Sequence, residues 1–161
     1  MHRARKEEIF TSEKIVATRK CLIPTFSYAD FDVYVSQTFM IINSERFNLK
    51  YLTGILNSTV VQFWLKYKGK MQGNNYQLDK EPLLKIPIIL VDNKKETDLI
   101  DLVNSMLNLN KELVNNQNNP NKKRIIEDQI ELTSKKINQL VYELYNLTNE
   151  DINIIEDVLN Y

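Results

Sequence analysis

Two long stripes of apolar residues after Asp92 place the strongest constraint on how this chain folds. Within each stripe, apolar residues recur at spacings of three and four, the period at which one face of an α-helix repeats. The first stripe consists of Leu99, Ile100, Val103, Met106, Leu107, Leu113 and Val114, and the second of Ile126, Ile130, Ile137, Leu140, Leu144 and Leu147. The polar segment NNQNNPNKK (115–123), which contains Pro120, separates them. The pattern predicts two helices packed as an antiparallel hairpin.

A short final helix is expected over Asn149–Leu159, because Ile152, Ile155 and Val158 would share one face of it. Thr148 and Asp151 have the spacing of a capping box, with Asp in the usual place of Glu.

Before Asp92 the segments are shorter and of mixed type. Runs rich in β-branched and aromatic residues predict strands at Ile15–Thr18, Pro24–Tyr28, Val33–Val35 and Phe39–Ile42. Asn48 is placed to cap a helix that runs to Leu56, and Ser58 to cap a second that runs to Tyr67.

Gly69 and Gly73 then interrupt the helical pattern and are expected to open a loop. After the loop we expect a strand at Tyr76–Leu78 and a short turn capped by Asp79. A further strand is expected at Ile86–Leu90, which Pro87 would confine to a sheet edge or a bulge.

These patterns together predict an α+β fold. Residues 1–92 would form a small mixed α/β domain, and residues 93–161 a helical hairpin with a closing helix. Hydrophobic residues make up 43% of the chain and charged residues 26%, as in an ordinary soluble domain, and no apolar run is long enough to cross a bilayer. The single Cys21 cannot form an intramolecular disulfide, so we expect a reducing, cytoplasmic environment.

The formal net charge of zero hides an uneven distribution of charge. Residues 1–92 hold thirteen Lys or Arg and nine Asp or Glu, a net charge of +4, while residues 93–161 hold eight and twelve, a net charge of −4. The basic half could face phosphate groups. The alternative is that lysine is abundant throughout and clusters by chance.

No catalytic motif is recognisable in the sequence. Three glycines cannot build a phosphate-binding loop, and His2, the only histidine, permits neither a histidine-based triad nor a histidine metal cluster. The carboxylates fall at helical i,i+4 spacings with lysine partners, as Glu131 does with Lys135, which is typical of solvated surfaces. We therefore expect no catalytic residue, no metal site and no cofactor in this chain.

The basic loop is the candidate DNA-binding segment, because lysines neutralise phosphates and amides can read base edges. Its members are Lys66, Lys68, Lys70, Gln72, Asn74, Asn75 and Tyr76, and a second candidate patch consists of Arg3, Arg5, Lys6, Arg19 and Lys20. For each lysine taken singly, a solvated surface charge is the better interpretation. Tyr67, Tyr76 and Trp64 have the alternative of core packing, which is the favoured one for Trp64.

Three segments resemble one family in order and spacing. They are RKEEIFTSEKIVATR near the start, LKYLTGILNSTVVQFWLKYKGK with LDKEPLLKIPI in the middle, and INQLVYELYNLTNEDINIIED (137–157) at the end. Together they resemble the TaqI-like C-terminal specificity domain of type II restriction-modification methyltransferases, and the resemblance covers nearly the whole chain.

The resemblance implies a target recognition domain for double-stranded DNA. In that family an upstream N6-adenine methyltransferase, often with a nuclease ahead of it, uses such a domain to select its site. By this resemblance the chain would be a C-terminal fragment, and Met1 the start of that fragment. The longer protein would use S-adenosylmethionine, and Mg²⁺ if it also cleaves DNA.

The leading hypothesis is thus a non-catalytic DNA-recognition domain linked to upstream methyltransferase or nuclease domains of the same polypeptide. The alternative is a protein-interaction module that docks through the helical hairpin without touching DNA. A dimer through exposed residues of the hairpin is also open.

Overall fold

The computed structural model describes residues 7–159 and has an α+β fold, which confirms the predicted fold class. The chain divides into two compact units. Unit 1 consists of Met1–Asn57 and Val61–Ile88, and unit 2 of Ser58–Val60 and Ile89–Tyr161. In the described part of the chain, no helix is both long and apolar enough to pass through a bilayer.

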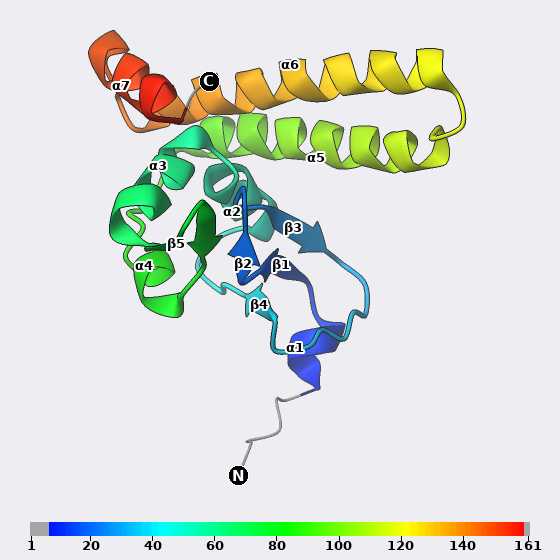
Figure 1. The fold of residues 1–161 in the computed structure, drawn as a ribbon, viewed down its shortest axis with the longest axis horizontal. Coiled ribbons are helices and arrows are strands. Elements are labelled where there is room, and N and C mark those ends of the chain that lie inside the picture. The colour runs from blue at the N-terminus through cyan, green and yellow to red at the C-terminus, as the bar shows by residue number, and fades with distance from the viewer. Residues whose placement is uncertain (1–6, 160–161) are drawn as a thin grey trace. The chain divides into compact units, whose positions relative to one another are not determined.

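Sheet A lies at the centre of unit 1 and has three antiparallel strands in the order β3-β1-β4 (Figure 1). The strands are β1 Lys14–Thr18, β3 Phe26–Ala29 and β4 Phe39–Ile42, and the short helix α1 Glu8–Thr11 precedes them. Ile15 and Ala17 are buried on the same face of β1, since alternate residues of a strand point the same way. The helix α2 packs against β1 and β3, so the core of this unit lies between α2 and sheet A.

Helix α2 spans Leu49–Leu56 and begins where the sequence predicts. The side-chain oxygen of Asn48 accepts hydrogen bonds from two backbone N–H groups of the first turn, at 2.8 and 3.3 Å, which is N-cap geometry. At the other end, the Asn57 amide donates to the carbonyl of Phe26 at 2.7 Å and accepts from its N–H at 3.0 Å. These two bonds tie the end of α2 to strand β3.

Helix α3 spans Thr59–Lys68, and Gly69 follows its end. The Gly69 N–H donates to the carbonyl oxygen of Leu65 at 2.9 Å, and a Cβ atom at Gly69 would lie 2.4 Å from that oxygen. Only glycine fits this close approach, which turns the chain out of α3 into the next strand. Trp64 is half-buried, and its indole N–H donates to the carbonyl of Pro82 in helix α4 (Lys80–Leu84) at 3.3 Å.

Sheet B replaces the loop that the glycines predicted. Its strands run antiparallel in the order β2-β6-β5, and they are β2 Lys20–Cys21, β5 Lys70–Gln72 and β6 Asn75–Gln77. Arg19 connects the two sheets through its backbone: its N–H donates to Thr38 at 2.9 Å, and its carbonyl accepts from the N–H of Leu78 at 2.7 Å. The prediction of an open loop was therefore wrong, because β5 and β6 pair as a hairpin.

Two predicted strands are also absent. Val33–Val35 has no strand partner, and the Val33 N–H donates instead to the carbonyl of Phe10 in α1 at 3.0 Å. Ile86–Leu90 is not part of a strand; the Ile86 N–H donates to the carbonyl of Leu83 at 3.2 Å at the end of α4, and Pro87 has no N–H to contribute to a ladder.

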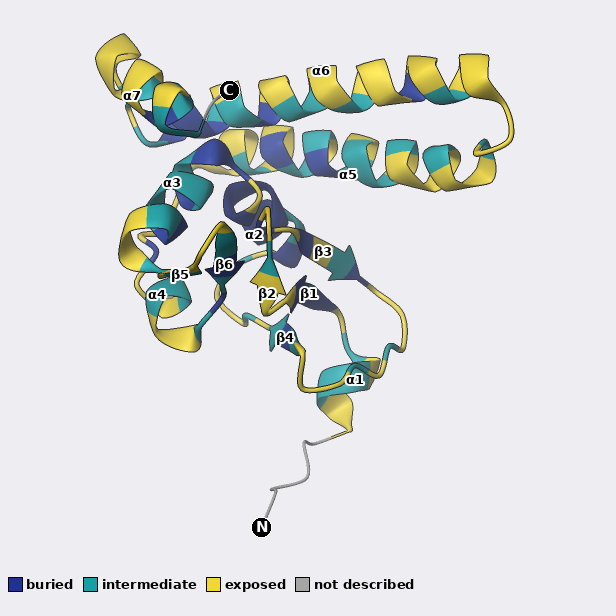
Figure 2. Ribbon diagram, viewed as in Figure 1, coloured by how far each residue is buried: buried dark blue, intermediate teal, exposed yellow. Residues whose placement is uncertain are grey.

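Unit 2 contains the predicted hairpin and closing helix. Helices α5 (Asn93–Asn115) and α6 (Pro120–Leu144) pack side by side in antiparallel directions, and α7 (Asn149–Leu159) follows (Figure 1). Their buried side chains are Leu99, Val103, Ile126, Ile137, Val141, Tyr142, Leu144 and Ile155. Figure 2 shows that exposed residues cover much of the outer surface of α5 and α6.

The predicted capping box at the start of α7 is confirmed. The Asp151 carboxylate accepts from the backbone N–H of Thr148 at 2.9 Å and from its hydroxyl at 2.7 Å. The Asp151 N–H donates back to the Thr148 hydroxyl oxygen at 3.2 Å. These reciprocal bonds satisfy donors that the first turn of a helix would otherwise leave open.

Candidate nucleic-acid interface

The pairing register of sheet B decides which side chains share a face. Lys20 on β2 and Lys70 on β5 both lie opposite Gln77 on β6, and Gln72 lies opposite Asn75. Directly opposed residues of antiparallel strands project to the same face, and neighbours along a strand project to opposite faces. One face of sheet B therefore carries two lysines and three amides. We call it the amide–lysine face; its residues are Lys20, Lys70, Gln72, Asn75 and Gln77.

The opposite face of sheet B is apolar. It carries Cys21, Met71 and Tyr76, which form the adjacent row of the ladder. Tyr76 is 6% exposed, and the other two are half-buried. Burial also raises the pKa of the Cys21 thiol, which keeps it protonated at neutral pH and agrees with its interpretation as a packed residue.

Tyr76 was predicted to face DNA, and here the structure requires a correction. Its side chain is directed to the apolar face because it alternates with Asn75 and Gln77 along β6, and it is almost completely buried. Tyr76 therefore packs under the hairpin, while the side chains of Asn75 and Gln77 lie on the amide–lysine face.

A tight turn at Gly73 and Asn74 joins β5 to β6. Gly73 has a φ of 61°, and Asn74 is not among the described residues with positive φ. Positive φ at the first central residue alone is the pattern of a type II′ turn, whose twist matches that of a two-stranded ribbon. The hairpin is thus a compact β-ribbon with exposed Asn74 at its tip.

The structure distributes the remaining predicted residues over several elements. Lys66 and Lys68 lie in the last turn of α3, where Lys68 is exposed and Lys66 is half-buried. Arg19 immediately precedes β2, so part of the second predicted patch joins the amide–lysine face through Lys20. Arg3, Arg5 and Lys6 lie outside the described residues.

Gln77 is a member of this face that the sequence analysis missed. Asn75 and Gln77 lie on either side of buried Tyr76 in β6, so they share the opposite face of the strand. This alternation with a period of two would have indicated Gln77 if the strand had been predicted at residues 75–77. Its amide oxygen accepts from the Gln72 amide at 2.7 Å, and its own amide N–H₂ donates to the carboxylate of Asp79 at 3.3 and 3.4 Å. Asp79, expected as a helix cap, makes no side-chain cap hydrogen bond to α4.

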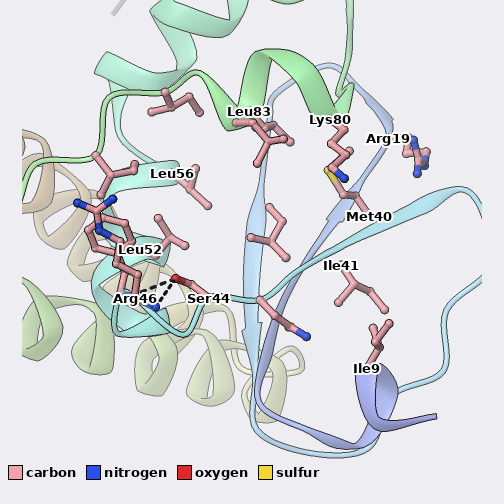
Figure 3. Close-up of a pocket in the computed structure, with 16 residues that line it drawn as sticks. Ile9, Arg19, Met40, Ile41, Ser44, Arg46, Leu52, Leu56, Lys80 and Leu83 are labelled. Carbon is pink, nitrogen blue, oxygen red and sulfur yellow. Dashed lines mark hydrogen bonds between the residues drawn. The ribbon is translucent and has the colours of Figure 1, made fainter. Parts of the chain in front are cut away.

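A cavity of about 650 Å³ also lies within unit 1, walled largely by aliphatic side chains such as Met40, Leu52 and Leu56 (Figure 3). Of the residues that the structure describes, three cationic ones line it, Arg19, Arg46 and Lys80, and no Asp or Glu does. Figure 3 shows Arg19 and Lys80 on one side, with Arg46 apart from them beside Ser44.

The Arg46 guanidinium lies 5.1 Å from the centre of the Phe47 ring, in cation–π range. Two of these three cations have carboxylates next to them in the chain, Glu45 beside Arg46, and Asp79 and Glu81 beside Lys80. Sequence analysis did not single out Arg46 or Lys80, because only the fold brings them to the same cavity as Arg19.

The geometry is therefore a β-ribbon whose one face offers ammonium and amide groups. Further cations lie on the segments that lead into its strands, namely Arg19 before β2, and Lys66 and Lys68 at the end of α3 before β5. Comparison with known protein families matches residues 1–88 to the TaqI-like C-terminal specificity domain. The chain belongs to this family. The match ends at Ile88, which is also the last residue of unit 1.

Two curated relatives come from Haemophilus influenzae. The chain is 32% identical over 96 residues to the type II methyltransferase M.HincII, covering 54% of the chain and 19% of that protein. It is also 32% identical over 96 residues to the type II methyltransferase M.HindII, from strain ATCC 51907 / DSM 11121 / KW20 / Rd, covering 54% of the chain and 18% of that protein. The matched part thus spans less than a fifth of the length of these relatives.

Proposed function

We propose that this member of the TaqI-like specificity domain family recognises a sequence in double-stranded DNA on behalf of a type II restriction-modification methyltransferase. The observation that carries the proposal is the amide–lysine face of sheet B, whose strand residues are two lysines and three amides, with the Asp79 carboxylate bound to Gln77 just beyond the end of β6. The family membership and the methyltransferase relatives support it.

The physical basis is the fit between a β-ribbon and the major groove. The groove of B-DNA is about 12 Å wide and admits a two-stranded β-ribbon, and its floor presents a different donor and acceptor pattern for each base pair. In this arrangement Lys20 and Lys70 contact phosphates and set the register, while the amides of Gln72 and Asn75 contact base edges. Lys68, Arg19 and Lys80 extend the basic surface along the phosphate backbone.

Catalysis belongs to other parts of the longer protein in this proposal. The two relatives are named as methyltransferases, and we infer that the longer protein methylates adenine at N6 with S-adenosylmethionine as methyl donor. If that protein also cleaves DNA, its endonuclease activity would use Mg²⁺. The described residues of this chain contain no group of three or more His, Cys, Asp or Glu arranged to hold a metal ion.

The alternative function, docking through the helical hairpin, has its own observation. Val114 at the end of α5 and Ile125 and Leu132 on α6 are large apolar side chains that are 70%, 58% and 55% exposed. Exposed apolar residues on a helix surface can mark a protein contact. This hypothesis and the hairpin-mediated dimer remain predictions.

The test is binding of the chain to duplex DNA at low salt, followed by titration with salt. The proposal expects binding that weakens steeply as salt rises, because phosphate contacts release counterions. It is refuted if neither the chain nor the longer protein binds duplex DNA at low ionic strength. Binding of another protein that Val114→Asp and Leu132→Asp abolish, without any DNA binding, would favour the alternative.

A further inference from the structure

Three side chains on sheet B and the segment after it form a directional hydrogen-bond relay. The Gln72 amide N–H₂ donates to the Gln77 amide oxygen at 2.7 Å, and the Gln77 amide N–H₂ donates to Asp79 at 3.3 and 3.4 Å. Gln72 is exposed, while Gln77 and Asp79 are half-buried. The relay therefore runs from the half-buried Asp79 outwards to the exposed side chain of Gln72.

The chemistry of Asp79 fixes the direction of this relay. An ionised carboxylate can only accept hydrogen bonds, so it selects the Gln77 orientation in which the amide nitrogen faces Asp79. That orientation leaves the Gln77 oxygen facing Gln72. An oxygen accepts only from a donor, so Gln72 must in turn present its nitrogen to Gln77. The side-chain amide of Gln72, which could otherwise rotate by a half-turn, is thereby held in a single orientation.

The fixed orientation leaves one hydrogen-bond acceptor and one donor of Gln72 at the exposed end of the relay. The carbonyl oxygen of Gln72 and one N–H of its amide have no hydrogen-bond partner within residues 7–159. A glutamine with one acceptor and one adjacent donor matches adenine in the major groove, where N6–H₂ donates and N7 accepts. Guanine presents two acceptors at the same edge and cannot satisfy the carbonyl oxygen.

We propose that Gln72 reads an adenine of the target sequence in the major groove, and that Asp79 acts through Gln77 as the positioning residue that sets this preference. Of the two N–H groups of the Gln72 amide, the one trans to the carbonyl oxygen donates to Gln77, and the one on the same side as the oxygen donates to adenine N7. This inference rests on the proposed function, since it names the base that the amide–lysine face reads.

The experiment begins with selection of duplexes that the 161-residue chain binds from a random pool, followed by affinity measurements on every single-base change of the preferred site. One position is expected to prefer adenine over each other base by roughly 5- to 150-fold. Replacing that adenine by 7-deazaadenine, which lacks the N7 acceptor, is expected to weaken binding to a similar extent.

The variants Gln72→Ala and Asp79→Ala are expected to lose the adenine preference at that one position while the salt dependence of binding stays unchanged. Asp79→Ala spares α4, because its side chain makes no cap hydrogen bond there. The matched control is Asp30→Ala, which removes one exposed carboxylate from the same unit outside the relay and should keep the preference.

The outcomes separate the two levels of the proposal. If the chain binds DNA but Gln72→Ala or Asp79→Ala keeps the adenine preference at every position, the relay is overturned and DNA recognition stands. If Asp30→Ala loses the preference as well, the effect is one of charge and the relay is again overturned. If the chain binds no duplex at all, the proposed function falls, and the inference falls with it.

Discussion

The two lysines on the amide–lysine face offer a quantitative test of phosphate contact. Lys20 and Lys70 flank Gln77 on either side, so their backbones are about 10 Å apart across two strand spacings, and each side chain can reach a phosphate of its own. Each phosphate neutralised on B-DNA contributes about 0.9 to the slope of log affinity against log salt. The double variant Lys20→Ala with Lys70→Ala should therefore have a slope lower in magnitude by about 1.8.

That change in slope gives a measurable difference in affinity. Between roughly 50 and 200 mM salt, a fourfold change, the parent chain should lose about 12-fold more affinity than the double variant. Fluorescence anisotropy of a labelled duplex over a salt series measures both slopes. The matched control is Lys94→Ala with Lys111→Ala, which removes the same charge from exposed positions of α5 and should leave the slope unchanged.

The reasoning is refuted if the two double variants shift the slope equally. That result would assign the effect to net charge alone and not to contacts made by the ribbon.

Three further predictions concern the scaffold. Asn57→Ala removes both hydrogen bonds to the backbone of Phe26 and should cost about 1–3 kcal/mol of unfolding free energy in a urea titration, with Asn57→Asp, which keeps the acceptor, recovering part of it. Gly69→Ala would place a Cβ 2.4 Å from a carbonyl oxygen of α3 and should cost about 1–3 kcal/mol, while an equal stability of parent and variant would contradict the close approach. Hydrogen bonds from Thr148 lower the pKa of Asp151 below its ordinary value of 3.8. Its contribution to stability is thus complete above the unfolded-state pKa and lost as the pH falls through the lower folded-state pKa. The stability difference between the parent and Asp151→Asn should shrink over that acidic range, and a difference that grows there would contradict the sign.

Local signals in the sequence predicted the five longer helices, α2, α3, α5, α6 and α7, but not the short helix α1. Asn48 caps α2 as expected, α7 has the predicted bounds, and the capping box of Thr148 and Asp151 forms. Each of these depends on residues only a few positions apart, so hydrophobic period and cap chemistry are sufficient to find them.

The sheet that carries the candidate site could not be predicted in the same way. Strand β2 has only two residues, and it exists because Lys20 pairs with Gln77 far along the chain. No local pattern contains that pairing, and without it the face shared by Lys20, Lys70 and Gln77 cannot be seen. The loop was expected to present Tyr76, whereas strand alternation buries it and brings Gln77 to the surface in its place.

The central claim is that DNA binds to the amide–lysine face of sheet B. The most direct measurement is a titration of isotope-labelled chain with duplex DNA, followed through backbone amide NMR signals at low salt. The account predicts that the largest shifts fall on Lys20 and on residues 70–77, with α5 and α6 little affected. Shifts that concentrate on α5 and α6, or saturable binding that leaves residues 70–77 unchanged, would contradict it.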